Sequence, residues 1–387
     1  MSSRQQTIWI IAGEESGDGY GARVAAELRR LRPEVRLAGM GGQQMRAAGV
    51  DLMVDSTELG VVGLVEVLKS LPFFIRLLNR LAAAARQERP DAVMLIDYPG
   101  FNLRLAERLH ADAIPVVYYI SPQIWAWKKN RIHRLARDVD RLLCIFPFEP
   151  AVYDGSGLDV RFVGHPLLEI LAPLRQTTTI RDQDLVLLLP GSRTSELRYH
   201  LPVFLATARE LHRQHPQWRF VMPLPRESCA ALARDIIQGL PGGGPDIAIT
   251  VGDTRQWMVR ATAGLAASGT VTVEATILGL PLVVAYKLNW LTGFLAKRIV
   301  KLPHISITNL VTGRGVLAEY LQHDAIPSKL APAVEAIMPG GNRRQEVLDG
   351  IRDCVTRLGA GQEVSATVAR HLLQTAGLAP EFPAQPS

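Results

Sequence analysis

The chain has 387 residues, 48% of them hydrophobic and 21% charged, and its formal net charge at pH 7 is +6. This length and composition predict a globular protein of about two domains. Three scattered cysteines, Cys144, Cys229 and Cys354, argue against a disulfide framework or a zinc site and favour a reducing compartment. The first residues lack the apolar run of a signal peptide, and no stretch of about 20 apolar residues follows, so we expect a cytoplasmic protein that does not span a membrane. The positive charge favours an anionic partner, which is nucleic acid, a phospholipid surface or a phosphorylated substrate.

Short apolar runs alternate with segments of helical spacing along the chain. These runs cover residues 7–12, 35–40, 92–97, 115–120 and 142–146 in the first half, and 185–190, 219–224, 247–251, 263–268 and 281–286 in the second. Runs without polar alternation are typical of parallel strands that are buried on both faces. The pattern predicts an α/β fold with two doubly wound, Rossmann-like domains that face a central cleft, where such folds bind ligands at the carboxyl ends of their strands.

Two polar loops follow strands of the first half. The loop Gly13-Glu14-Glu15-Ser16-Gly17-Asp18-Gly19 joins the opening strand to a helix, and because it departs from G-x-G-x-x-G it fits a polar ligand better than a dinucleotide. Asp97 is the only charged residue of its run and stands at the end of the strand. A carboxylate at the mouth of a cleft can have a raised pKa and act as a general base, although a simple turn or N-cap aspartate fits the sequence nearly as well.

Two turns of the second half each join a strand to the start of a helix. Ser268-Gly269-Thr270 would present free amides at the positive end of a helix dipole, where a phosphate is favoured. Glu274 lies one helical turn further on the same face, within reach of a ribose, so the stretch predicts a nucleotide site. An ordinary capped helix with a solvent-facing glutamate explains it equally well. The turn Pro190-Gly191-Ser192-Arg193-Thr194-Ser195-Glu196 offers further backbone donors and a permanently charged guanidinium for a diphosphate.

Other patterns favour structure over chemistry. Asp138-Val139-Asp140 resembles a D-x-D metal motif, but acidic residues between a basic helix and a strand more often cap or pair. His212 and His215 have no third ligand nearby and are best explained as surface residues, and His165 as a hinge residue between the domains. The chain contains neither a G-x-x-x-x-G-K-[ST] loop nor a G-x-S-x-G elbow, which argues against a P-loop nucleotidase and an α/β-hydrolase.

Residues 61–78 are unusually apolar for an exposed helix pair and too interrupted to span a bilayer. Core packing explains about half of these side chains, and a lipid-facing surface explains the others together with Lys69 and Arg76. The basic and aromatic segments 125–131 and 290–301 favour the same interfacial role. The predicted lipid contacts are Val61, Val62, Leu64, Val67, Leu68, Leu71, Phe73 and Phe74.

Several motifs in order make the chain resemble the lipid-A-disaccharide synthase family. They are Gly13-Glu14-Glu15-Ser16-Gly17-Asp18, Ile96-Asp97-Tyr98-Pro99-Gly100-Phe101-Asn102, Ser121-Pro122-Gln123-Ile124-Trp125-Ala126-Trp127, Phe146-Pro147-Phe148-Glu149, Gly164-His165-Pro166, Leu189-Pro190-Gly191-Ser192-Arg193, Ala267-Ser268-Gly269-Thr270 and Asn309-Leu310. The resemblance implies an inverting, metal-independent GT-B glycosyltransferase of lipid A biosynthesis without a cofactor. It would transfer the sugar of UDP-2,3-diacylglucosamine to 2,3-diacylglucosamine 1-phosphate, on the cytoplasmic face of the inner membrane.

The resemblance also suggests roles for the candidate residues and a division of the chain. It implies an acceptor and membrane-facing domain at 1–168, a UDP-sugar domain at 169–342, and helices at 343–387 that pack back on the first domain. Asp97 would be the base, and the acceptor side would include Glu14, Ser16, Gly17, Asp18 and Asn102. The UDP-sugar side would include Gly191, Ser192, Arg193, Ser268, Gly269, Thr270, Glu274 and Asn309. The partners would be the two lipid substrates and an anionic phospholipid surface, without nucleic acid, and a homodimer is allowed.

The chain departs from the family pattern at Glu15, Gly100 and Thr308, where a small residue, an acidic residue and a proline are common. Gly100 leaves Asp97 as the only candidate base of its loop. Two other functions stay open on the sequence alone: a UDP-sugar epimerase of the same architecture, and a non-enzymatic membrane-binding module.

Overall fold

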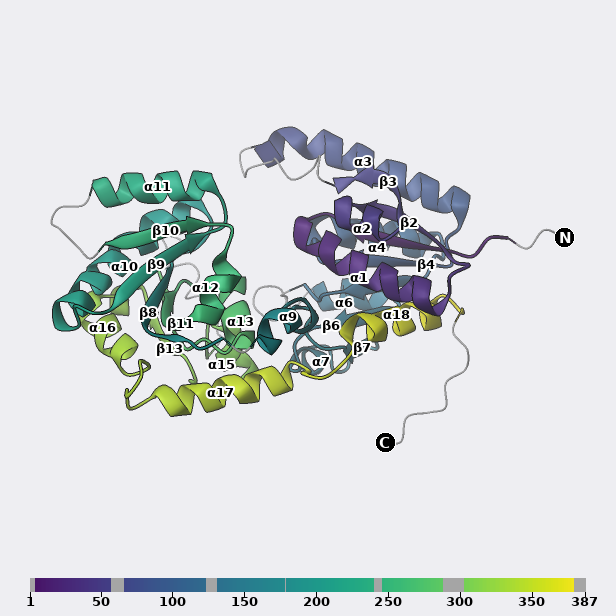
Figure 1. Ribbon diagram of the computed structural model, residues 1–387. Helices are drawn as coiled ribbons and strands as arrows, with labels where there is room; N and C mark the ends of the chain where they lie inside the picture. Colours follow the sequence, from purple (N-terminus) through teal and green to yellow (C-terminus); the bar gives the residue numbers. More distant parts are fainter. Residues whose placement is uncertain are drawn as a thin grey trace. The chain divides into compact units, whose positions relative to one another are not determined.

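A computed structural model describes residues 4–56, 66–122, 131–177, 179–239, 246–287 and 303–378, with the side chains of 66–71 and 131 left out. The chain forms two compact units: Met1–Pro166 with Gly361–Ser387, and Leu167–Ala360. Each unit is a parallel sheet covered by helices (Figure 1). No helix in these ranges is long and apolar enough to cross a membrane.

The sheet of the first unit has seven strands in the order β3-β2-β1-β4-β5-β6-β7. The strands are β1 (Thr7–Ala12), β2 (Arg36–Gly41), β3 (Asp51–Asp55), β4 (Ala92–Ile96), β5 (Val116–Tyr119), β6 (Arg141–Cys144) and β7 (Asp159–Phe162). Every residue of β1 and β4 is buried, as expected for central strands without polar alternation. The strand order reverses between β1 and β4, where Ala12 pairs with Ile96. The loops that begin at Gly13 and Asp97 therefore leave the sheet side by side.

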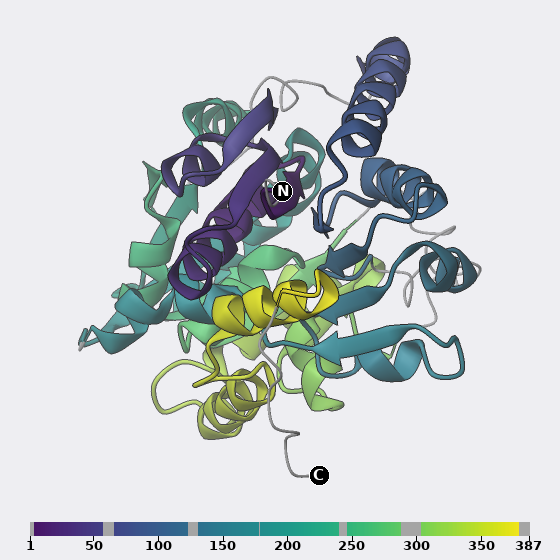
Figure 2. The same ribbon diagram turned by 90° about the vertical axis from the view of Figure 1, so that its right-hand side faces the viewer.

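Helices cover both faces of this sheet. They are α1 (Glu15–Leu31), α2 (Gln43–Ala47), α3 (Glu66–Glu88), α4 (Pro99–Ala111), α6 (Arg131–Asp138), α7 (Glu149–Val152) and α18 (Val364–Thr375). Buried leucines of α3, α4 and α6 pack on Trp9 and Ile11 in one core. On the other face α18 lies beside α1 (Figure 2), so the end of the chain completes the first unit.

The second unit has a six-stranded sheet in the order β10-β9-β8-β11-β12-β13. Its strands are β8 (Asp182–Leu189), β9 (Arg219–Leu224), β10 (Ile247–Val251), β11 (Ala261–Ala266), β12 (Leu282–Tyr286) and β13 (Ala318–Leu321). Its helices are α8 (Leu167–Ile170), α9 (Ala172–Gln176), α10 (Thr194–Gln214), α11 (Glu227–Gln238), α12 (Thr254–Arg260), α13 (Thr270–Ile277), α15 (Ile307–Thr312), the 3-10 turn η2 (Gln322–Asp324), α16 (Pro327–Glu335) and α17 (Arg344–Arg357). Here the order reverses between β8 and β11, whose ends pair at Leu189 and Ala266.

The division differs from the predicted one at the C-terminal helices. We expected residues 343–387 to pack on the first domain, but the second unit runs to Ala360 and includes α17. The reason is close packing, because a Cβ on Gly350 would lie 2.4 Å from Cγ1 of Val316. Arg344 of α17 also donates 2.7 Å to the carbonyl of Ile337. Of the two C-terminal helices, only α18 belongs to the first unit.

Candidate active site

The turn after β4 holds Asp97 in a strained conformation. Asp97 and Tyr98 have φ values of 45° and 49°, in the left-handed region that non-glycine residues rarely adopt. Surrounding groups fix the turn: Asn102 Nδ2 donates 2.8 Å and Tyr118 Oη 2.6 Å to the main-chain oxygen of Asp97. The Asp97 amide donates 2.9 Å to the carbonyl of Tyr119. Backbone strain that is enforced from several sides is typical of functional sites.

The environment of Asp97 suits a proton acceptor. Burial and, second, the negative charge of Glu14 raise the pKa of Asp97 to about 6, while a hydrogen bond from the Tyr98 amide opposes the shift. A carboxyl group with this pKa is mostly ionised at neutral pH and is a better base than an ordinary aspartate. The influence of Glu14 also means that the first loop lies beside Asp97, as the adjacent ends of β1 and β4 require.

The first loop makes close contact with the turn at Asp97. A Cβ on Gly13 would lie 2.5 Å from Cδ1 of Tyr98, so a glycine is needed for the ring to pack there. Glu14 and Ser16 are exposed and available to a ligand, whereas Gly17 is buried against Ala12.

Asp18 and Asn102 have roles other than the predicted ligand contact. Asp18 is buried, and its Oδ1 accepts hydrogen bonds of 2.6 Å from the Gly42 amide and 3.0 Å from the Met45 amide, which caps the start of α2. Asn102 is buried completely, and its Nδ2 donates to the carbonyls of Asp97 and Ile96. Both side chains are committed to holding the loops. Polarity alone does not distinguish a residue that holds a loop from one that binds a ligand.

In the second unit, the turn after β8 already contains a carboxylate. The amides of Ser192 and Arg193 donate 2.9 Å and 3.2 Å to Oε2 of Glu196, although we predicted them as donors to a diphosphate. Gly191 has a φ of +113°, and a Cβ there would lie 2.4 Å from the same Oε2. The guanidinium of Arg193 also pairs with Glu196, but its side chain is 79% exposed and free to meet a ligand. The sequence signal for Glu196 was its place three residues after the helix N-cap, as in a capping box.

The turn after β11 keeps the geometry expected of an anion site. Gly269 is extended, and a Cβ added there would meet no atom within 4 Å, so a ligand can approach the backbone. The first amides of α13, at Thr270 and Val271, have no acceptor within their helix. Ser268 Oγ donates 3.1 Å to the carbonyl of Ile305, which fixes the start of the turn.

Glu274 is paired with an arginine that the sequence analysis missed. Its Oε1 accepts hydrogen bonds of 3.1 Å and 2.5 Å from Nε and Nη2 of Arg255. The Glu274 side chain is only 16% exposed, so it is not the solvent-facing glutamate of an ordinary helix. Oε2 takes no part in this pair.

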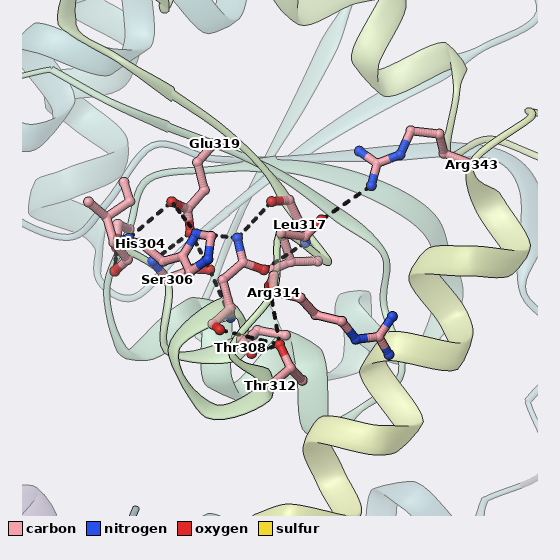
Figure 3. A network of polar contacts seen from close by, with 12 residues as sticks. His304, Ser306, Thr308, Thr312, Arg314, Leu317, Glu319 and Arg343 are labelled. Atoms are coloured by element: carbon pink, nitrogen blue, oxygen red, sulfur yellow. Dashed lines mark hydrogen bonds and ion pairs between the residues drawn. The ribbon is translucent and has the colours of Figure 1, made fainter. Parts of the chain in front are cut away.

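Asn309 lies inside a polar network rather than on a ligand-accessible surface. It is 1% exposed. Its Nδ2 donates 2.8 Å each to the carbonyl of Leu317 and to Glu319, and its Oδ1 accepts 2.8 Å from the Leu317 amide. Glu319 also accepts hydrogen bonds from the Ile305 and Ser306 amides (Figure 3). Asn309 is therefore not placed for the predicted contact with the UDP-sugar. It acts on the turn after β11 indirectly, because the network fixes Ile305, whose carbonyl accepts a hydrogen bond from Ser268.

The departure at Thr308 has a local explanation. Its hydroxyl lies 2.7 Å from that of Thr276, and both side chains are buried. A proline at 308 would leave the Thr276 hydroxyl without this partner. The departure at Gly100, by contrast, has no explanation in the packing, because a Cβ added there would meet no atom within 4 Å.

The structure describes part of the predicted lipid segment. Val61, Val62 and Leu64 lie outside the described residues. The same holds for residues 125–130 and for the whole segment 290–301. Val67, Leu68 and Leu71 belong to α3, but their side chains are not described. Phe73 is 45% exposed, and Phe74 is half-buried with its ring 6.5 Å from that of Phe101. Ile75, which is not among the predicted lipid contacts, is 48% exposed.

The D-x-D motif is engaged in structural contacts. Asp138 pairs with Arg137 over 2.6 Å, and Asp140 accepts 2.7 Å from the Val116 amide. Within the described ranges no group of three histidine, cysteine or acidic residues is placed to hold a metal ion. His215 is half-buried, with its ring stacked on that of Trp218 and its Nε2 3.2 Å from Oε1 of Glu335.

Known proteins match nearly the whole chain. The sequence model of a family described as Lipid-A-disaccharide synthetase matches residues 8–372. The lipid-A-disaccharide synthase of Anaeromyxobacter dehalogenans strain 2CP-1 is 40% identical over 359 residues, which cover 91% of this chain and 93% of the relative. That of Nitrosococcus oceani is 37% identical over 372 residues, which cover 94% and 95%.

Solved structures share the fold at low sequence identity. A UDP-GlcNAc 2-epimerase from Neisseria meningitidis, bound to UDP-GlcNAc, has a TM-score of 0.63 at 12% identity and covers 95% of this chain and 100% of its own. MurG from Acinetobacter baumannii has a TM-score of 0.55 at 14% identity, with 95% and 99% covered. The predicted fold of two parallel α/β domains is thereby confirmed as the one that GT-B glycosyltransferases and these epimerases share.

Proposed function

The chain belongs to the lipid-A-disaccharide synthase family, and on that premise we propose that it joins UDP-2,3-diacylglucosamine to 2,3-diacylglucosamine 1-phosphate. The products are a tetraacyl disaccharide 1-phosphate and UDP. The structural observation that carries the proposal is Asp97, a carboxylate held in a strained turn with its pKa raised to about 6. A transferase of this kind needs one base to take a proton from the acceptor hydroxyl.

We assign the acceptor to the first unit. Asp97 accepts the proton of the attacking sugar hydroxyl as the new glycosidic bond forms. Glu14 and Ser16 of the neighbouring loop are exposed and can hydrogen-bond the acceptor, and the Glu14 charge keeps Asp97 basic. Asp18 and Asn102 act indirectly, because they hold the two loops in place.

We assign the UDP part of the donor to the second unit. The open backbone at Gly269 and the first amides of α13 receive a phosphate, and Glu274 receives the ribose through its Oε2. Arg193 is exposed and stabilises the negative charge that develops on the departing UDP. This electrostatic role replaces the one that a metal ion plays in other sugar-nucleotide enzymes.

We also propose that the protein binds an anionic membrane surface on the cytoplasmic face of the inner membrane. Both substrates carry acyl chains, so the site has to receive them from a bilayer. Phe73 and Ile75 expose apolar side chains on α3, and Arg76 is exposed next to them. Exposed apolar groups beside basic residues are typical of an interfacial helix.

An epimerase of the same fold is the alternative, but the UDP-GlcNAc 2-epimerase from Neisseria meningitidis is 12% identical to this chain, whereas the synthase of Anaeromyxobacter dehalogenans is 40% identical. Product analysis separates the two functions. The protein is incubated with the UDP-sugar alone and with both substrates, and the products are separated by chromatography and identified by NMR spectroscopy, which distinguishes epimers of equal mass. The proposal predicts UDP and a disaccharide only when both substrates are present. An isomerised UDP-sugar formed without the acceptor would support the epimerase instead.

A further inference from the structure

His200 belongs to none of the motifs described above, and the proposed mechanism gives it no function. It lies near the start of α10 and is 1% exposed, yet both of its ring nitrogens have partners. Nδ1 lies 3.0 Å from the carbonyl oxygen of Pro190, and Nε2 lies 3.0 Å from the amide of Lys287. A carbonyl can only accept and an amide can only donate, so Nδ1 carries the proton and Nε2 accepts. The ring is therefore neutral and in one defined tautomer.

The two partners of His200 lie on either side of the turn Ser268-Gly269-Thr270, which we call the nucleotide turn. Pro190 directly follows β8, and Lys287 directly follows β12. In the sheet β11 lies between these strands, and its end leads into Ser268-Gly269-Thr270. One imidazole thus ties together the two segments that flank the nucleotide turn. The ring is packed between aromatic groups, with centroids 5.3 Å from Tyr286 and 6.0 Å from Phe204.

His200 acts on the same turn as Glu196, which lies one helical turn earlier on the same face of α10. His200 donates to the carbonyl of Pro190, while Glu196 accepts from the amides of Ser192 and Arg193. Together they hold three backbone groups of residues 190–193. The direction in which the exposed Arg193 side chain leaves the turn is set by these contacts.

We propose that His200 is a positioning residue for the donor: it fixes the loops after β8 and β12 so that Arg193 and the turn at Gly269 meet the diphosphate together. This inference rests on the proposed assignment of UDP to the second unit. His200 is buried and touches the substrate through neither nitrogen, so its effect is exerted through the backbone of its two partners.

The test compares two variants of His200 with a matched control. His200→Phe keeps an aromatic ring but loses both hydrogen bonds, whereas His200→Gln keeps one donor and one acceptor. His215→Gln changes another histidine, the C-cap residue just past the far end of the same helix. For each full-length protein, the Kd for UDP is measured by calorimetry, and KM is measured separately for donor and acceptor.

We expect His200→Phe to raise the Kd for UDP and the KM for the donor about tenfold. A tenfold rise in Kd corresponds to a loss of about 1.4 kcal/mol in binding free energy. The acceptor KM stays within about twofold, since only loops of the second unit are disturbed. His200→Gln recovers most of the affinity, and His215→Gln behaves like the wild type. Lys287→Pro removes the amide that Nε2 accepts from and is expected to raise the donor KM as well, which provides a test if His200→Phe does not fold.

Unchanged UDP affinity in folded His200→Phe and Lys287→Pro would overturn the inference while leaving the proposed function intact. Equal increases of both KM values, with no recovery in His200→Gln, would also overturn it, because they would indicate a general structural defect. A wild-type protein that does not bind UDP would instead contradict the proposed donor site itself.

Discussion

Asn102 Nδ2 donates a 2.8 Å hydrogen bond to the main-chain oxygen of Asp97, at the point where the backbone has a φ of 45°. The same nitrogen donates 3.1 Å to the carbonyl of Ile96. Asn102 thus bridges the last residue of β4 and the candidate base. Its Oδ1 is buried and has no hydrogen-bond partner within the described residues, so the amide group serves the turn through its donor side.

Replacing Asn102 by leucine should destabilise the protein and reduce turnover together. The carbonyls of Ile96 and Asp97 would each lose one hydrogen bond, and that of Asp97 would keep only the bond from Tyr118 Oη, which we expect to cost about 2 kcal/mol in the free energy of unfolding. The turn would relax and Asp97 would move away from the acceptor hydroxyl. Chemical denaturation and kcat measure the two effects, with His110→Gln, an exposed change on the same helix, as control. Full activity in Asn102→Leu would refute this role.

The raised pKa of Asp97 predicts an acid limb in the pH profile. The base must be ionised, so kcat/KM should fall below pH about 6, approaching tenfold per pH unit. Burial is the larger cause of the shift and the Glu14 charge the second. Glu14→Gln should therefore move the acid limb to lower pH, whatever it does to the maximal rate. A limb at the same pH in this variant would mean that Glu14 does not influence the base.

The same shift predicts that Asp97 lowers the stability of the folded state at neutral pH. The pKa of Asp97 is about 6 in the folded protein and near 4 in the unfolded chain. As the pH rises, the unfolded chain therefore loses this proton at a lower pH than the folded protein does. Stability contributed by the protonated group is present below pH about 4 and is lost between about 4 and 6. Asp97→Asn should consequently stabilise the protein by about 2–3 kcal/mol at pH 7 and by little at pH 4. Equal stabilisation at both pH values would contradict the shift.

The exposed residues of α3 allow a test of membrane binding that spares the core. Phe73 and Ile75 are 45% and 48% exposed, whereas Leu77 and Leu78 are buried. Phe73→Ser with Ile75→Ser should weaken binding to anionic liposomes at least tenfold with little change in melting temperature. Co-sedimentation measures the binding, and the exposed double change Arg134→Gln with Glu107→Gln on α6 and α4 serves as control. Unchanged liposome binding would remove α3 from the proposed membrane surface.

The central strands and the edge strand β10 were predictable from the sequence, and the other three edge strands were not. All ten predicted runs correspond to strands, because β1, β2, β4, β5, β6 and β8 to β12 are rich in apolar residues. The strands β3, β7 and β13 lie at sheet edges, where half-exposed sequences such as Asp51–Asp55 have only three apolar residues in a row. Their hydrogen bonds come from a neighbouring strand that the local sequence does not reveal.

The site was predictable as a set of loops but not as a set of contacts. Asp97 and the turn at Gly269 could be found because each follows a buried strand. The influence of Glu14 on Asp97 and the bonds of His200 depend on which strands are neighbours. Asp18 and Asn309 have the same polar chemistry as ligand-binding residues, and only their burial shows that they hold loops instead.

The most direct test of the account is turnover of UDP-2,3-diacylglucosamine and 2,3-diacylglucosamine 1-phosphate in detergent micelles with a metal chelator, comparing wild type with Asp97→Asn. The account predicts that the wild type forms UDP and disaccharide without added metal. It also predicts that the folded variant, although it binds UDP normally, loses at least about a hundredfold in kcat. Wild-type activity that is retained in Asp97→Asn, or that appears only when divalent metal is added, would contradict it.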